Sequence, residues 1–137
     1  MKNILVIDGQ GGRIGREIIE RLKAECCACI ITAVGTNSMA TAAMLKGGAD
    51  QAATGENAVI VNAARTDILV GPVGIVVADA LLGEITPAMA VAVGQSRALK
   101  LLIPVNQCNN VIVGVGKCSV KAMLDDVVAQ VKTAIQS

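Results

Sequence analysis

The sequence predicts an α/β fold built on one doubly wound, mostly parallel sheet. Short apolar runs alternate along the chain with segments of helical spacing, and this alternation is typical of parallel sheets covered by helices. Glycine-rich or polar turns separate the runs, which gives each strand and helix a defined end. At 137 residues the chain is long enough for one domain with its own core and too short for two.

The first half of the chain holds three strand–helix pairs. Its opening run is rich in β-branched residues, as expected for a buried central strand. After a cluster of glycines, Ile14, Ile18, Ile19 and Leu22 recur at helical spacing. Asn37 or Ser38 can cap the second helix, and Gly47 and Gly48 end it. The predicted strands cover residues 3–8, 27–34 and 49–53, and the predicted helices follow residues 12, 38 and 56.

The second half continues the alternation. A fourth strand over residues 67–70 precedes a segment, 75–82, that we expect to be helical from its position alone. Thr86 and Pro87 form a strong helix start, a cap followed by proline in the first turn. A fifth strand over 99–105 is expected to form a hairpin with a short edge strand over 111–115, and Ser119 begins the closing helix. The predicted strand order is about 3-2-1-4-5, with the short strand at the edge.

The composition limits the possible partners. Net charge is +1, basic residues do not form runs, and aromatic residues are absent, which argues against nucleic acid. No uninterrupted apolar stretch reaches the roughly 18 residues of a membrane span, and the start does not resemble a signal peptide. We therefore expect a cytoplasmic protein. An apolar fraction of 53% is hard to bury in one small monomer, which favours a homo-oligomer.

The composition also restricts the chemistry. His and Tyr are both absent, so general acid–base catalysis would depend on Asp, Glu, Lys or Cys. The weak catalytic candidates are Glu56, Glu84, Asn106 and Cys108. Glu56 is equally an ordinary first-turn helix acid, whereas Glu84 lies in a loop that could overhang a site. The cluster Cys26-Cys27-Ala28-Cys29 is poorly arranged for tetrahedral ligation and has no His to complete it, so no metal is expected.

The turn after the first strand carries the clearest functional signal. Its glycines have the spacing G-x-x-G-x-x-G, which allows a sharp turn, close approach of a pyrophosphate and tight helix packing. Amides at the start of the helix would then face an anion. The sequence thus predicts a Rossmann-like nucleotide-binding domain over residues 1–137; the alternative is a turn that serves packing only. The predicted phosphate-binding residues are Gly9, Gln10, Gly11, Gly12, Arg13, Ile14 and Gly15.

Two further segments are expected to line the same site. Thr36, Asn37 and Ser38 follow the second strand, where a dinucleotide places its adenosine ribose. No carboxylate stands there in the sequence, which favours NADP over NAD, although these residues can equally cap the next helix. Gly71-Pro72-Val73-Gly74 follow the fourth strand at the topological switch, where they can lie against a ligand or form a rigid turn. Among cofactors, NAD(P) is therefore the expectation.

Several segments together resemble a known family. The stretches Ile7–Gly12, Gly35–Asn37, Ala53–Asn57, Gly71–Ile75 and Gly83–Ala90 are similar to an uncharacterised bacterial family, domain of unknown function 3842. The resemblance covers nearly the whole chain and implies a Rossmann-like fold without a defined reaction. The glycine turn is also similar to that of extended short-chain dehydrogenases. Catalysis of that type needs a Tyr–Lys pair, which a chain without Tyr cannot provide.

Three functions remain open from the sequence. The leading hypothesis is a dinucleotide-binding or other phosphate-ligand-binding domain that acts as a sensor, regulator or partner subunit. The second is a small oxidoreductase or transferase whose site is completed across an oligomer interface. The third is a structural or interaction protein that has lost its ligand, which a blocked glycine turn would indicate.

Overall fold

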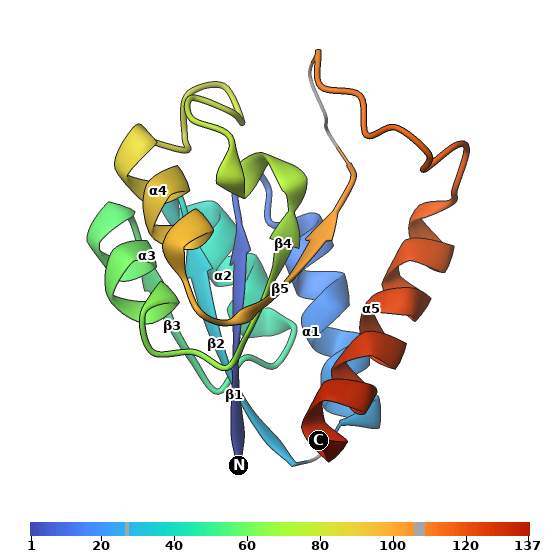
Figure 1. Ribbon diagram of the computed structural model, residues 1–137. Coiled ribbons are helices and arrows are strands. Elements are labelled where there is room, and N and C mark those ends of the chain that lie inside the picture. Colours follow the sequence, from blue (N-terminus) through green and yellow to red (C-terminus); the bar gives the residue numbers. More distant parts are fainter. Residues whose placement is uncertain (27, 106–108) are drawn as a thin grey trace.

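A five-stranded, all-parallel sheet forms the centre of the molecule, with strand order β3-β2-β1-β4-β5 (Figure 1). The computed structural model describes residues 1–26, 28–105 and 109–137. Ile4, Leu5, Val6 and Ile7 of the central strand are all buried, because neighbouring strands and both helical layers cover them. The predicted sheet and strand order are confirmed. The strands are β1 (Lys2–Asp8), β2 (Cys29–Gly35), β3 (Gln51–Thr54), β4 (Ile68–Pro72) and β5 (Leu99–Ile103).

Helices cover both faces of the sheet, with α1 and α5 on one side and α3 and α4 on the other (Figure 1). Asn37, Thr86 and Ser119 cap three of the helices, since each side-chain oxygen accepts a hydrogen bond from the backbone N–H three residues later. These three caps agree with the predicted helix starts. The helices are α1 (Arg13–Glu25), α2 (Ser38–Lys46), α3 (Glu56–Ala63), α4 (Pro87–Gln95) and α5 (Val120–Gln136).

The core has two layers, one on each face of the sheet. One layer joins the sheet to α1, α2 and α5, and it includes Ile18, Leu22 and Val131. The other joins the sheet to α3 and α4, and it includes Val59 and Val93. Both layers consist of aliphatic and sulfur-containing side chains, because the chain has no aromatic residue. Of the helices among the described residues, none combines the length and the hydropathy needed to cross a membrane.

The predicted edge strand over residues 111–115 is wrong. The structure has no strand there, and most of these side chains are exposed, so β5 is the last strand of the sheet in the described part of the chain. Asn109, Gly114 and Gly116 have φ values of 56°, 89° and 65°. A backbone that turns into the left-handed region this often cannot follow the extended path of a strand.

The predicted helix over residues 75–82 is also wrong. A short 3₁₀ helix, η1 (Val73–Val76), follows β4, and a series of turns leads from it to α4. Asp79, Leu81 and Leu82 have positive φ values of 65°, 56° and 56°, which a right-handed helix does not allow. The loop instead closes on itself through the Asp79 N–H, which donates to the Ile85 carbonyl at 2.7 Å.

Candidate functional site

The glycine turn joins the carboxyl end of β1 to the start of α1. The Gly12 N–H donates to the Gly9 carbonyl at 2.9 Å and closes the turn. Asp8 links the two ends of the turn, because its carboxylate accepts hydrogen bonds from the N–H groups of Gly9 at 2.8 Å and Gly15 at 2.7 Å. The turn enters the left-handed region at Gln10 and Gly12, with φ values of 50° and 71°. Strand, turn and helix therefore have the order that the sequence predicts.

Two of the glycines serve packing. A Cβ added at Gly12 would lie 2.7 Å from the Cα of Ala40, so α2 passes directly against the turn. A Cβ at Gly15 would lie 2.6 Å from the Met44 sulfur and 2.9 Å from the Asp8 Cβ. Gly15 thus has the predicted role of bringing the helix close to the sheet, whereas Gly12 brings α2 close to the turn. Gly11 has no atom within 4 Å of such a Cβ and faces open space.

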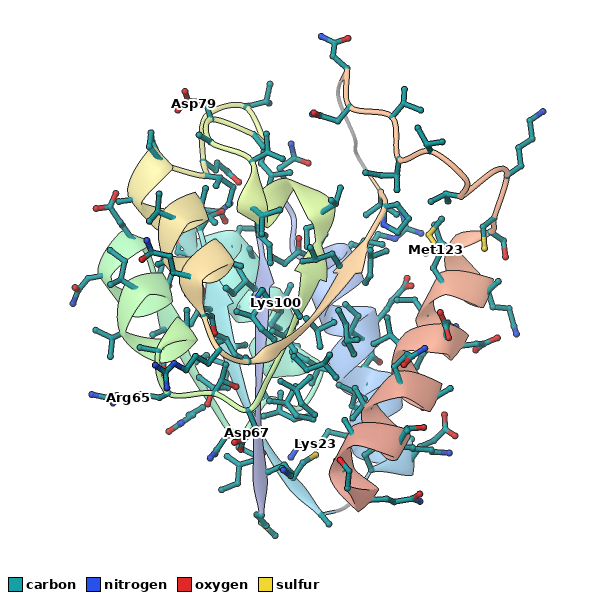
Figure 2. The ribbon with its side chains drawn as sticks, viewed as in Figure 1. Lys23, Arg65, Asp67, Asp79, Lys100 and Met123 are labelled. Atoms are coloured by element: carbon teal, nitrogen blue, oxygen red, sulfur yellow. The ribbon has the colours of Figure 1, made fainter. Side chains whose placement is uncertain are left out.

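The carboxylate of Glu84 lies on the turn. Its Oε1 accepts hydrogen bonds from the Gln10 N–H at 2.7 Å and the Thr36 hydroxyl at 2.9 Å, and its Oε2 accepts one from the Asn37 side-chain amide at 2.9 Å. Glu84 comes from the loop between η1 and α4, whose tip carries the labelled Asp79 (Figure 2). Three separate segments of the chain therefore meet at one carboxylate.

The two acids of the site have opposite pKa shifts. Burial opposes the charged form of Glu84, but the hydrogen bonds from Gln10, Thr36 and Asn37 outweigh it and hold the pKa of its carboxyl below the ordinary value. Burial raises the pKa of Asp8, and the nearby charge of Glu84 adds to the rise, against the lowering effect of its two backbone hydrogen bonds. Glu84 is therefore the stable anion of the site.

Replacing Glu84 with Gln should lower the free energy of unfolding at pH 7 by about 1–2 kcal/mol, because hydrogen bonds to a charged acceptor are lost. The folded-state pKa of Glu84 is lowered, so this stabilisation is present above its unfolded value, about 4.3. It is lost as the pH falls through the folded-state value. Urea denaturation of wild type and E84Q from pH 7 to pH 3 measures the difference. A difference that stays constant over this range would contradict the assignment.

The residues after β2 combine both roles that the sequence left open. Asn37 caps α2 through its Oδ1, while its amide donates to the Gln10 carbonyl at 2.9 Å and to Glu84. Thr36 also bonds Glu84, and Ser38 is the exposed first residue of α2. The expectation of NADP rested on the absence of a carboxylate here. Because the fold brings Glu84 to this position, that reason for preferring NADP over NAD no longer holds.

The segment Gly71-Pro72-Val73-Gly74 lies at the end of β4, which pairs with β1. The sequence placed all four residues after the strand, but Gly71 and Pro72 are its last two residues and pair with β5, and Val73 and Gly74 begin η1. A Cβ at Gly71 would lie 2.6 Å from the Ile7 carbonyl oxygen, so this glycine permits close strand packing. Gly71, Pro72 and Gly74 are buried and Val73 is half-buried. The location at the topological switch agrees with the sequence, and contact with a ligand remains a prediction.

The other candidates do not join the cluster. Glu56 lies in the first turn of α3 and is exposed, as expected of an ordinary first-turn acid. Arg13 is exposed and lies 3.7 Å from Glu17, and Ile14 is half-buried in the first turn of α1. Asn106 and Cys108 lie outside the described residues. Within residues 1–26, 28–105 and 109–137, no three His, Cys, Asp or Glu side chains are arranged to hold a metal ion.

The chain has one family match and a distant structural neighbour among known proteins. Residues 3–136 match the family described as Domain of unknown function (DUF3842). The chain belongs to this family. No curated protein matches the sequence. A crystal structure described as a dodecameric FMN-dependent Ubix-like decarboxylase from Escherichia coli O157:H7 is similar in structure. It has a TM-score of 0.44 and 16% sequence identity, over 100% of this chain and 95% of that chain. Similarity at this level supports no conclusion about ligand or reaction.

The sequence analysis named Glu84, Gln10, Thr36 and Asn37 as candidates but did not predict the hydrogen bonds that join them. Glu84 was expected as a catalytic candidate in an overhanging loop, and the loop does bring it to the turn. Its partners Thr36 and Asn37 lie 48 and 47 residues away in the chain. The position of Glu84 in the loop just before a capped helix was the only signal in the sequence that placed it near the site.

Proposed function

We propose that this protein binds a phosphate-bearing ligand of nucleotide type at the glycine turn, with NAD(P) as the first class to test. The observation that carries the proposal is that the turn region already holds an anion. A backbone N–H, a hydroxyl and a side-chain amide converge on the Glu84 carboxylate. Phosphate oxygens accept hydrogen bonds from the same kinds of donor. A Rossmann-like binding role follows from this donor set and its position.

The surroundings of the turn support the same ligand chemistry. Gly12 provides no side-chain cap for α1. Asp8 already takes the Gly15 N–H, so the N–H groups of Arg13 and Ile14 are the first-turn amides that a ligand would meet, and the helix dipole favours negative charge there. The turn follows β1, and the chain crosses to the other half of the sheet at β4. Ligands of open α/β sheets bind at this switch, beyond the carboxyl ends of the strands.

The proposed role is binding rather than catalysis. Both Glu84 oxygens accept hydrogen bonds from the protein, and both Asp8 oxygens accept them from turn amides. These are the acids that contact the turn in the described part of the chain, and neither is placed as a general base. A sensor, regulator or partner subunit fits this arrangement, and the apolar composition supports a homo-oligomer.

A thermal-shift panel tests the proposal. NAD, NADH, NADP, NADPH, FMN, ATP and a sugar nucleotide are each added to the wild-type protein. A ligand at about one hundred times its dissociation constant should stabilise the folded state by about 2.7 kcal/mol, which raises the melting temperature by several degrees. We expect at least one phosphate-bearing compound to give this shift, and the matching nucleoside without phosphate to give none. An equal shift with that nucleoside would contradict a phosphate site.

The same carboxylate favours a second candidate function. Glu84 already accepts the hydrogen bonds that the Gln10 N–H and the Thr36 hydroxyl would donate to a ligand. The protein can therefore be a structural or interaction protein that no longer binds a ligand. In that case Glu84 ties the loop before α4 to the ends of β1 and β2. A panel without any shift, in wild type and in a variant that lacks Glu84, would favour this second function.

A further inference from the structure

We propose that Glu84 is a resident anion that a phosphate ligand must replace, so that the side chain closes the site in the absence of ligand. This inference rests on the proposed function and adds the regulation of the same site. The exchange needs no covalent step. One acceptor group leaves the donors of Gln10, Thr36 and Asn37, and another takes them.

The first argument is space. A Cβ added at Gly9 would lie 2.6 Å from the Glu84 Oε1 and 2.6 Å from the Thr36 Oγ1. The carboxylate oxygen therefore fills the space that the absent side chain of Gly9 leaves open. Close backbone approach at such a glycine is what a pyrophosphate requires, so the carboxylate and a phosphate cannot occupy this position together.

The second argument is charge. Asp8 already places a buried acid beneath the turn. If Glu84 stayed in place beside a phosphate, two anions would share the same three donors and repel each other at short range. When one anion replaces the other, the two are separated and each donor keeps an acceptor.

The third argument is the loop that carries Glu84. Leu81 and Ile85 are buried on either side of it, and the Ile85 N–H donates to the Ala80 carbonyl at 3.1 Å. These contacts hold the ends of the segment while Leu82 and Gly83 lie exposed between them. Glu84 can therefore leave the turn by rotation of its side chain without loss of the loop.

The loop that carries Glu84 has a strained backbone that its own contacts maintain. Asp79, Leu81 and Leu82 all have left-handed backbone conformations, which are unfavourable for residues with a Cβ. Such a conformation persists only where surrounding contacts hold it, and the hydrogen bonds of Glu84 are among those contacts. The backbone hydrogen bonds from Asp79 to Ile85 and from Ile85 to Ala80 do not involve the Glu84 side chain, so they can hold the loop when Glu84 turns away.

The test compares the affinity for pyrophosphate of wild type, E84A and E84Q by isothermal titration calorimetry at pH 7.5. If Glu84 occupies the donors for nine-tenths of the time or more, its removal should lower the dissociation constant at least tenfold. E84Q should give a smaller decrease, because the amide keeps one acceptor oxygen. The control is E25Q, which removes a charge at the far end of α1 and should bind as wild type does.

Three results would overturn the exchange. An equal dissociation constant in wild type and E84A, or weaker binding in E84A, overturns it while leaving an anion site in place. Binding to neither protein overturns the proposed function as well. A crystal structure of the wild type with pyrophosphate gives an independent test that does not depend on the folding of a variant. We expect a phosphate oxygen within hydrogen-bond distance of the Gln10 N–H and Glu84 turned away; Glu84 still bonded to Gln10 beside bound pyrophosphate would overturn the exchange.

Discussion

Replacement of Gly12 with Ala should lower the free energy of unfolding by about 3 kcal/mol. Gly12 has a φ of 71°, and a residue with a Cβ loses roughly 1–2 kcal/mol in that region. The new Cβ would also lie 2.7 Å from the Cα and from the carbonyl oxygen of Ala40. These are backbone atoms of α2 and cannot rotate away, so overpacking adds about 1–3 kcal/mol. Urea denaturation followed by circular dichroism measures the loss.

The neighbouring glycine provides the matched control. Gly11 is exposed, and a Cβ built there meets no atom within 4 Å. Gly11→Ala should therefore leave stability unchanged or raise it by up to about 1 kcal/mol, because alanine restricts the unfolded chain. Similar losses in the two variants would show that the turn needs glycine for a reason other than its contact with α2.

The two adjacent glycines show where sequence reasoning reaches its limit. Gly12 belongs to the G-x-x-G-x-x-G spacing with Gly9 and Gly15, and Gly11 is an additional glycine beside it. The spacing does not indicate that Gly12 makes a contact with α2. The difference between them comes from Ala40, which lies 28 residues after Gly12 and reaches the turn only because α2 packs against α1. The sequence therefore predicts that the turn needs glycines and that Gly15 packs the helix against the sheet, but not the contact of Gly12 with α2.

The elements that were predicted correctly have local causes. The apolar run of β1 predicts a buried central strand, and Thr86 followed by Pro87 predicts the start of α4. The two errors, over residues 75–82 and 111–115, have different causes. In the first segment Leu81 and Leu82 have positive φ, and leucine gives no sequence signal for that conformation, because contacts with other parts of the chain hold it. In the second segment the residue with positive φ is Gly114, and the prediction followed the apolar run around it rather than the conformational freedom of glycine.

Part of the site was predictable because it, too, has local causes in the sequence. The glycine turn and the polar residues after β2 follow directly from strand ends, and parallel strands bring their carboxyl ends to one edge. Glu84 is different, because a loop of irregular conformation carries it to that edge. Glu84 changes the chemistry of the site, because it places a carboxylate beside Thr36 and Asn37, where the sequence after β2 has none. The polar residues after β2 therefore cannot be interpreted without Glu84, which their own stretch of sequence does not contain.

Replacement of Leu22 with Ala should also lower the free energy of unfolding by about 3 kcal/mol, within the range of 2–5 kcal/mol for such a change in a core. Leu22 has no exposed surface and lies in the layer between the sheet, α1 and α5. The layer has no aromatic side chain, so no ring can move in to fill the cavity. The melting temperature should fall by about 10 °C for a chain of this size, as measured by calorimetry or circular dichroism.

Leu45→Ala is the control for this prediction, because it removes the same atoms from another helix. Leu45 lies in α2 with half of its surface exposed, so its truncation should change stability by less than about 1 kcal/mol. Comparable losses would mean that the exposed face of α2 is buried in solution, which an oligomer interface would explain. The pair of variants thus tests the packing of α1 against the sheet and, through the control, the homo-oligomer that the apolar composition favours.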